Sequence, residues 1–346
     1  MLNQIPKIVI ALALCVCTCV SPYDVRVNNA LQILTVEGTL TDEGTEQKIQ
    51  IAQSNFVKDA LYKTLIKDLK VELWVNRKDK IQLIEQKEGF YALPNTFRAK
   101  SGDTYQLLFQ KPDGTKYESS EEIMKVVPKI DTIYDEFVLN GVLRGEKRVP
   151  TNNVYIDYQD TPNERNYYLF SWTLWERQYI CASTSNYDLY CNQDCWEIVS
   201  NDDIDIFSDV YTNGKPIVGK LAAEIPYYQT NGALIEIKQQ RISYDSYQFL
   251  KLLKNQVQNT GTLVDTPPEA LVVNIRNLTN PDEKVAGAFM VASVSSVKYW
   301  ISREDANGKA SPIGLLGRKP LTSPAGVLMP CIASRTRTPI KPNGWR

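Results

Sequence analysis

Short stretches of alternating apolar and polar residues, each followed by turn residues, run from residue 31 to about residue 120 and constrain the fold most. The stretch "LQILTVEGTL" alternates in this way and leads into the turn residues "TDEG". The clearest stretch, "LKVELWV", places its apolar side chains on one face: Leu69, Val71, Leu73 and Val75. Alternation with a period of two is the pattern of a strand with one buried face. This part of the chain is therefore predicted to form β-strands rather than helices.

A hairpin turn is indicated at "KPDGT", inside the longer stretch "GDTYQLLFQKPDGTKYESS". Pro112 presets the backbone for the first turn position, and Gly114 accepts a positive φ. Roughly six or seven strands in about ninety residues, with turns at short intervals, are typical of a β-sandwich. We predict an Ig-like or transthyretin-like β-sandwich domain over residues 31–127.

Pro128 interrupts this pattern in "VVPKIDTIYDEF", because proline cannot donate a hydrogen bond to a strand ladder. We place a domain boundary there and predict a second, larger β-rich domain over residues 128–346. Two alternating strands flank the turn "DTPNERN", and "VAGAFMVASVSSVKYWISR" supplies two more. The irregular tail that follows needs tethering, which Cys331 and Trp345 can supply.

One helix is predicted, over residues 244–258, from the segment "SYDSYQFLKLLKNQVQNTG". Ser243 can cap its start, Asp245 suits the positive end of the helix dipole, and Gly261 follows its end. The apolar residues fall on one side of the helix: Tyr247, Leu250, Leu253 and Val257. We expect this stripe to dock the helix on a sheet as part of the core, so that the whole protein is mostly β with one docked α-helix.

The N-terminus carries an apolar run, "IVIALALCVCTCV", that is too short for a helix spanning a bilayer and suits a signal peptide. Three cysteines end this run, and a bacterial lipoprotein signal ends in a small residue followed by the cysteine that takes the lipid. Thr18 is the smallest residue preceding any of the three, so we favour Cys19 as the lipid attachment point, with Cys17 as the alternative. Residues 1–18 are then the signal peptide and residues 19–30 a tether, unless the run is an ordinary secretory signal.

Four further cysteines remain in the mature chain: Cys181, Cys191, Cys195 and Cys331. In an exported protein such cysteines form disulfides, and four of them allow three pairings. We expect one local bridge within Cys181–Cys195 and one longer bridge to Cys331. A zinc site is disfavoured because the spacing contains no CxxC and the chain has no histidine; no metal and no cofactor is expected.

Composition narrows the possible functions. The chain has no histidine, which excludes Ser–His and Cys–His nucleophiles, and we expect a protein that is not an enzyme and has no catalytic residues. The net charge of −1 provides no basic field, so nucleic acid is not an expected partner. The acidic run "SNDDIDIFSD" clusters hard oxygens that could bind calcium, but it lacks the glycine and spaced glutamate of an EF-hand, and a solvated loop is the favoured reading.

Aromatic residues are concentrated in "YYLFSWTLWERQYI" and in the cysteine-rich stretch after it. Tyrosine and tryptophan combine large apolar area with a polar group and are common in binding surfaces. The candidates for ligand contact are Trp172, Trp175, Tyr179, Tyr187, Tyr190 and Trp196. Alternating aromatics in a strand also belong to a core, which is the competing explanation.

The order of these features resembles the DUF4249 family, lipoproteins of the Bacteroidota. The matching stretches include "PYD" after the cysteines, "LTVEGTLTDE", "EGFYALP", "SGDTYQL", "VPKIDTIYDEF", "RISYDSYQFLKLLKNQVQNTG", "EKVAGAFMVASV" and the closing "CIAS" and "KPNGW". The family's function is unknown, and it offers no catalytic residues to transfer. Members are commonly encoded beside TonB-dependent outer-membrane receptors.

The resemblance implies a protein held at the outer membrane by its lipid, on the periplasmic or the cell-surface side, that works as an accessory or ligand-binding partner of a TonB-dependent β-barrel transporter. The alternative is a structural or adhesion lipoprotein of the cell envelope with no role in transport. A hydrolase that uses carboxylates is the least favoured class, because no motif places a pair of acids.

Overall fold

The computed structural model describes residues 32–44, 47–57, 60–87, 89–258, 273–322 and 326–346. It is mostly β with one α-helix among these residues, which confirms the predicted fold class. The lipid candidates Cys19 and Cys17 lie outside the described residues. Within the described residues, no helix combines the length and apolar character that a membrane span requires.

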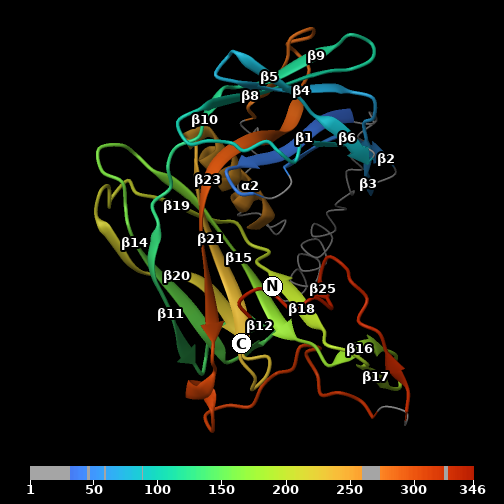
Figure 1. Ribbon diagram of the computed structural model, residues 1–346, viewed down its shortest axis with the longest axis vertical. Helices are drawn as coiled ribbons and strands as arrows, with labels where there is room; N and C mark the ends of the chain where they lie inside the picture. The colour runs from blue at the N-terminus through green and yellow to red at the C-terminus, as the bar shows by residue number, and fades with distance from the viewer. Residues whose placement is uncertain (1–31, 45–46, 58–59, 88, 259–272, 323–325) are drawn as a thin grey trace, which may run out of the picture.

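The upper unit in Figure 1 consists of two groups of strands packed face to face. One group contains β1 (Gln32–Thr41), β2 (Lys48–Val57), β3 (Ala60–Leu65), β6 (Ile84–Lys87) and β7 (Phe90–Ala92). The other contains β4 (Lys70–Val75), β5 (Asp79–Gln82), β8 (Thr104–Gln110), β9 (Lys116–Ser119), β10 (Glu122–Ile123) and β22 (Ile275–Asn277). The sheet order of this second group is β22-β9-β8-β4-β5, with β10 on β8.

A single apolar core lies between the two groups, as the alternating pattern predicts. The four expected side chains, at position 69 just before β4 and at positions 71, 73 and 75 within it, are all buried, and they pack with Val36 of β1 and Leu107 of β8. Burying an aliphatic side chain of this size contributes about 1.5–3 kcal/mol. The predicted hairpin turn is also present, with Gly114 at φ 90° and the Lys111 amide donating to the Thr115 carbonyl over 2.9 Å.

The lower unit is a second pair of sheets. Its smaller sheet has the order β11-β14-β20, formed by β11 (Ile130–Val138), β14 (Thr151–Gln159) and β20 (Pro216–Pro226). The facing sheet is formed by β15 (Tyr167–Arg177), β18 (Trp196–Ser200), β19 (Asp205–Ser208), β21 (Ala233–Ile242), β23 (Val285–Ile301) and β25 (Arg337–Thr338). Side chains of both sheets, such as Ile156, Phe170 and Ile235, form the second core.

Short elements complete the chain. They are β12 (Leu143–Arg144), β13 (Lys147–Arg148), β16 (Ile180–Ser183), β17 (Asp188–Cys191), β24 (Leu328–Met329) and the 3₁₀ helix η1 (Glu304–Ala306). The strands β16, β17 and β24 form a small separate sheet that projects from the lower unit in Figure 1.

Strand β23 crosses from one unit to the other (Figure 1). Its first half, residues 285–292, pairs in parallel with β1, and residues 293–301 pair in antiparallel fashion with β21. Gly287 lies where β23 meets β1, at φ 87°, and a Cβ there would lie 2.0 Å from the Val36 carbonyl oxygen. Because β22 also joins the upper unit, the region predicted as residues 31–127 is completed by two strands that the sequence pattern assigned to the second domain.

The helix α2 (Tyr244–Gln258) has the predicted bounds. The Ser243 hydroxyl accepts a hydrogen bond from the Ser246 amide over 3.2 Å, so the expected cap is present. Leu250 is buried, and the Tyr247 ring lies 4.9 Å from the ring of Tyr167 in β15. The helix thus docks on the lower sheet, close to the junction of the two units.

Candidate functional site

Two disulfides shape the projecting part of the lower unit, residues 178–196, 314–322 and 326–340, which we call the disulfide lobe. Cys181 bonds to Cys191, with Cα atoms 4.9 Å apart, and Cys195 bonds to Cys331, with Cα atoms 5.6 Å apart. One bridge is local and the other spans 136 residues, in agreement with the expected local bridge and longer bridge to Cys331. The sulfurs of the first three cysteines lie within 4.8 Å of one another, and all three are committed to these bridges.

The disulfide lobe and the adjoining strand ends enclose a cavity of about 260 Å³, which we call the tyrosine cavity. Its lining is largely apolar and consists of Gln178, Tyr179, Ile180, Tyr190, Tyr228, Gln229, Gly314, Leu315, Leu316, Arg318 and Pro320. Two of the predicted contact residues, Tyr179 and Tyr190, therefore meet here. They remain 48% and 40% exposed, so their rings are accessible to a ligand.

Polar groups hold the tyrosine rings in place. The Tyr179 hydroxyl accepts a hydrogen bond from the Asn231 side-chain amide over 2.9 Å. The Arg144 guanidinium donates to the Tyr228 hydroxyl over 2.8 Å and lies 5.3 Å from the ring centre. Burial raises the pKa of Tyr228, so this phenol stays neutral. The rings of Tyr179 and Tyr228 are thus held before any ligand arrives, which lowers the entropic cost of binding.

One wall of the tyrosine cavity is anchored by Asp188, whose side chain is fully buried. Arg318 binds this carboxylate with both guanidinium nitrogens, at 2.7 and 2.8 Å, and the Leu321 amide donates to it over 2.6 Å. These contacts hold the pKa of Asp188 well below its usual range. These hydrogen bonds thereby attach the segment 318–321 to β17 within the disulfide lobe.

Behind the tyrosine cavity lies a buried ion pair between Glu176 and Arg303, both fully inaccessible to solvent. Arg303 also donates to the carbonyls of Gln229 and Asn231, over 3.1 and 2.9 Å. The Gln229 amide in turn donates to Glu176 over 2.6 Å. Burial raises the pKa of Glu176, while the Arg303 charge opposes that rise. The pair fixes the 228–231 segment that carries one of the cavity tyrosines.

The predicted aromatic set does not form one surface. Trp172 packs against the core between the two lower sheets. Trp175 lies on the opposite face of β15, because neighbouring odd and even positions of a strand face opposite ways, and the Lys298 ammonium lies 5.6 Å from its ring. Tyr187 is 37% exposed in the loop between β16 and β17.

Trp196 was expected as a contact residue, and the structure corrects this expectation. Only 1% of its surface is exposed. Its ring packs edge-on against Trp345, with centroids 5.8 Å apart, and the Arg177 guanidinium lies 5.5 Å from it. The C-terminal tail is thus tethered by Cys331 and Trp345, as predicted, and Trp196 is buried beneath Trp345 of this tail.

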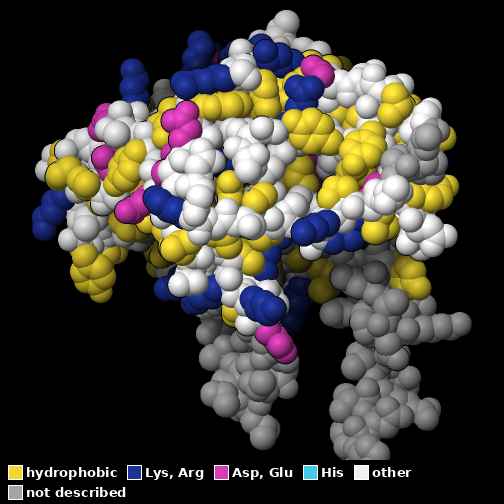
Figure 2. Space-filling view, turned by 90° about the horizontal axis from the view of Figure 1, so that it is seen from below, with side chains coloured by type: hydrophobic (Ala, Val, Ile, Leu, Met, Phe, Trp, Pro, Cys, Tyr) yellow, Lys and Arg dark blue, Asp and Glu magenta, His cyan; other side chains and the backbone are white. Residues whose placement is uncertain are grey.

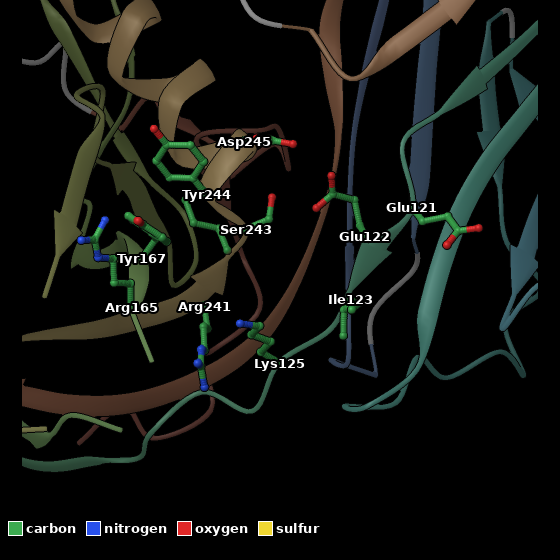
Figure 3. A pocket seen from close by; sticks show the side chains of 11 residues that line it. Glu121, Glu122, Ile123, Lys125, Arg165, Tyr167, Arg241, Ser243, Tyr244 and Asp245 are labelled. Carbon is green, nitrogen blue, oxygen red and sulfur yellow. The ribbon is translucent and has the colours of Figure 1, made fainter. Parts of the chain in front are cut away.

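A second hollow lies at the junction of the two units and is shown in Figure 3. This junction cleft has a volume of about 290 Å³, and its lining carries three cations, Lys125, Arg165 and Arg241, together with three acids, Glu121, Glu122 and Asp245. Lys125 and Arg241 both pair with Glu164, so the two cations share one carboxylate. Burial raises the pKa of Glu122, which faces the start of α2 in Figure 3. We read the junction cleft as a polar contact between the units, and the tyrosine cavity as the better ligand site.

Several cavity residues were missed by sequence reasoning. Tyr228 follows strand β20 in "IPYYQTNG", and Leu316 and Arg318 lie in an irregular segment. No periodicity or motif distinguishes these residues. They reach Tyr179 and Tyr190 only through the tertiary fold and the long disulfide.

Comparison with known sequences gives one match. The family described as "Domain of unknown function (DUF4249)" matches residues 20–298. The chain belongs to this family. No curated protein and no solved structure matches the chain. The family resemblance drawn from the sequence is thus confirmed, while the family itself names no activity, ligand or partner.

Proposed function

We propose that this DUF4249 protein is a lipoprotein of the bacterial outer membrane, anchored through Cys19, that serves as an accessory or ligand-binding partner of a TonB-dependent transporter. The observation that carries the proposal is the tyrosine cavity in a lobe closed by two disulfides. Rigid aromatic rings in a fixed frame give a binding surface with little entropic cost. The cavity's volume, below the usual range of about 300–1,000 Å³ for small-molecule sites, suits one apolar or ring-shaped portion of a larger ligand.

The cysteines support an exported location. Disulfides persist in oxidising compartments, and both bridges join cysteines of the disulfide lobe. The leader pattern before Cys19 and the family's usual genomic setting, as the resemblance implies them, support a lipid anchor and a β-barrel neighbour. Several acyl chains on one cysteine would hold the protein at the membrane persistently.

An exposed apolar face beside the tyrosine cavity offers a surface for the barrel. Tyr190 and Leu328 are neighbours across β17 and β24 and are 40% and 55% exposed. Ile332 and Ile340, at 69% and 75%, are exposed in the same lobe. Figure 2, which views the molecule from below, shows hydrophobic side chains on this side with few acidic side chains among them. Scattered apolar residues are normal, but two exposed neighbours such as Tyr190 and Leu328 offer a contact for a partner.

The test is cross-linking of the tagged full chain in intact envelopes, followed by identification of the captured proteins. We expect a TonB-dependent β-barrel to be captured, and we expect capture to fall when Tyr190→Ser and Leu328→Ser are combined. The matched control is Tyr211→Ser, because Tyr211 is 90% exposed and lies outside the lobe. Capture that never contains a barrel, together with impaired cell attachment on gene deletion, would favour the structural or adhesion role instead.

The lipid anchor has its own test. The intact mass of the membrane-extracted protein is expected to equal a chain that begins at Cys19 and carries acyl groups. A mature chain beginning at Cys17 moves the anchor by two residues and leaves the function unchanged. A mature N-terminus that is not an acylated cysteine contradicts the membrane-tethered function.

A further inference from the structure

Two buried aspartates face each other at the end of the lower unit, where β14 leads into β15 and β19 leads into β20. Asp160 begins the turn "DTPNERN", and Asp209 begins the turn "DVYTNG". Their residues are 1% and 0% exposed. The acidic run "SNDDIDIFSD" therefore does not act as one cluster. Asp202 and Asp203 are exposed, and only Asp209 at its end is buried.

Neither aspartate has a cationic partner among the described residues. The cations of the neighbouring strands are engaged elsewhere, Lys220 with Asp205, and Arg241 with Glu164. Asp160 accepts hydrogen bonds from the Tyr168 hydroxyl over 2.6 Å and from the Gly214 amide over 2.8 Å. These neutral donors do not compensate two charges, and an unpaired buried charge is costly.

Oxygen atoms converge on one point between the two turns, which the side-chain amide of Asn166 occupies. The amide nitrogen lies 2.9 Å from Asp209 Oδ2, 3.5 Å from Asp160 Oδ2, 2.7 Å from the Thr161 carbonyl and 3.1 Å from the Glu164 carbonyl. An NH₂ group has two hydrogens and cannot satisfy four acceptors. The four acceptor oxygens therefore outnumber the two hydrogens that the amide can donate.

Two further oxygens of this cluster have no hydrogen-bond partner in the described part of the chain. They are Asp209 Oδ1 and Asn166 Oδ1, both on residues that are at least 99% buried. Thr212 Oγ1, in the turn that Asp209 begins, is buried and unpartnered as well. Buried polar atoms are nearly always satisfied, so these oxygens around two carboxylates are available to a further partner, and a cation suits their charge.

We propose that Asp160, Asp209 and Asn166, with the carbonyls of Thr161 and Glu164, form a calcium site. When the Asn166 side chain rotates about χ1 and χ2 and its amide leaves this point, a divalent cation can take its place, with Oδ1 turned towards the ion as the fifth protein ligand and a protein charge of −2 opposite it. Carboxylates, an amide oxygen and backbone carbonyls in flexible turns are the ligands that Ca²⁺ takes, whereas Mg²⁺ demands stricter geometry and keeps its water.

Calcium at this site would act on the junction cleft. The turn that supplies Asp160 and Asn166 also carries Glu164, which pairs with Lys125 and Arg241. The ion would therefore fix the turn whose Glu164 binds Lys125, a residue of the segment between β10 and β11 that connects the two units. This role is independent of the tyrosine cavity, so failure of either hypothesis leaves the other standing.

The site is tested with the full chain, its disulfides intact, by thermal unfolding in EDTA and in CaCl₂ and by luminescence of Tb³⁺ excited through tyrosine. We expect Ca²⁺ at about a hundred times its Kd to raise Tm by about 5 °C. Tb³⁺ should luminesce, since the Tyr168 hydroxyl touches Asp160, and Ca²⁺ should quench the signal by displacement.

The variant Asp209→Asn removes one charge with little change of shape and should abolish both responses, while Asp202→Asn, on the exposed part of the same acidic run, should keep them. Loss of both responses in the control, their survival in Asp209→Asn, or an equal Tm shift with MgCl₂ would overturn the assignment. A wild-type chain indifferent to Ca²⁺ and Tb³⁺ would show instead that the two aspartates share a proton.

Discussion

The two ends of strand β15 differ in how buried carboxylates are compensated. At the end beside the disulfide lobe, Glu176 is fully buried and binds the equally buried Arg303. At the other end, Asp160 precedes the strand and faces Asp209 with no cation of the described chain beside it. At the first end the chain itself supplies the opposite charge, that of Arg303. The other end needs either a proton or an ion from outside.

The difference teaches how each end responds to its surroundings. A buried pair supplied by the chain is insensitive to salt and ions, because solvent does not screen it. A pair of like charges depends on what the solution provides, since a metal ion or proton relieves the repulsion. The disulfide end is therefore expected to keep its stability whatever the ions in solution. The stability of the aspartate end is expected to depend on protons and metal ions, and we call it the conditional end.

One of the two largest effects is expected from breaking the pair of Glu176 and Arg303. Arg303→Met leaves Glu176 charged and buried without its partner, and should lower the free energy of unfolding by about 3–5 kcal/mol. The measurement is urea denaturation followed by circular dichroism. The variant should also weaken any binding at the tyrosine cavity, because Arg303 holds the carbonyls of Gln229 and Asn231.

The double variant Glu176→Met with Arg303→Met is the matched control. Removing both charges replaces the pair by apolar side chains, and should recover most of the stability lost in the single variant. A double variant as unstable as Arg303→Met alone would show that the hydrogen bonds of Arg303 to backbone carbonyls, rather than the uncompensated charge, carry the effect.

An effect of comparable size distinguishes the two disulfides at the same end. In the chain-entropy model, Cys195→Ala with Cys331→Ala, which opens a separation of 136 residues, should cost about 4–5 kcal/mol. Cys181→Ala with Cys191→Ala opens a separation of 10 residues and should cost about 2–3 kcal/mol. The comparison is made by thermal and urea unfolding. Equal losses would indicate that local packing, not loop closure, determines the contribution of each bridge.

A smaller effect of opposite sign is expected at the conditional end. Burial and the facing Asp160 raise the pKa of Asp209, so in metal-free protein at pH 7 its charge destabilises the folded state. Asp209→Asn should therefore raise Tm in EDTA by about 2–4 °C, the size expected for roughly 1 kcal/mol. A fall in Tm would mean that the ionised carboxylate stabilises the turn.

The pH dependence has a definite sign. An acid whose pKa is raised in the folded state binds its proton more tightly there, so lowering the pH stabilises the fold through this group. The gap in Tm between Asp209→Asn and the wild type, both in EDTA, should narrow as pH falls from 7 towards 5. The exposed control Asp202→Asn should change Tm by less than a degree at either pH.

Much of the fold follows from the sequence because local patterns determine it. The alternating β4 segment, the turn at Gly114 and the helix capped by Ser243 depend on neighbouring residues, and each was predicted with its bounds or its buried face. Trp196 shows the limit of such patterns. An aromatic residue beside a cysteine looks the same in sequence whether it faces solvent or receives Trp345 from the C-terminus.

The sites depend on residues that only the tertiary fold brings together. Asp160 and Asp209 are 49 positions apart by their numbering, and each lies in an ordinary polar turn. The tyrosine cavity joins Tyr190 to Tyr228 and Arg318. No single-sequence pattern encodes these pairings, since burial and the lack of a cationic partner appear only in three dimensions.

The crossing of β23 between the units also sets an order of events during synthesis. Strand β1 is among the first described residues to leave the ribosome, but its parallel partner, residues 285–292, emerges about 250 residues later. Contacts this distant in sequence form slowly, and an unpaired strand edge is prone to aggregation while it waits. The upper unit therefore completes its sheet only near the end of translation, and a chaperone that shields the free edge of β1 until then should raise the yield of folded protein.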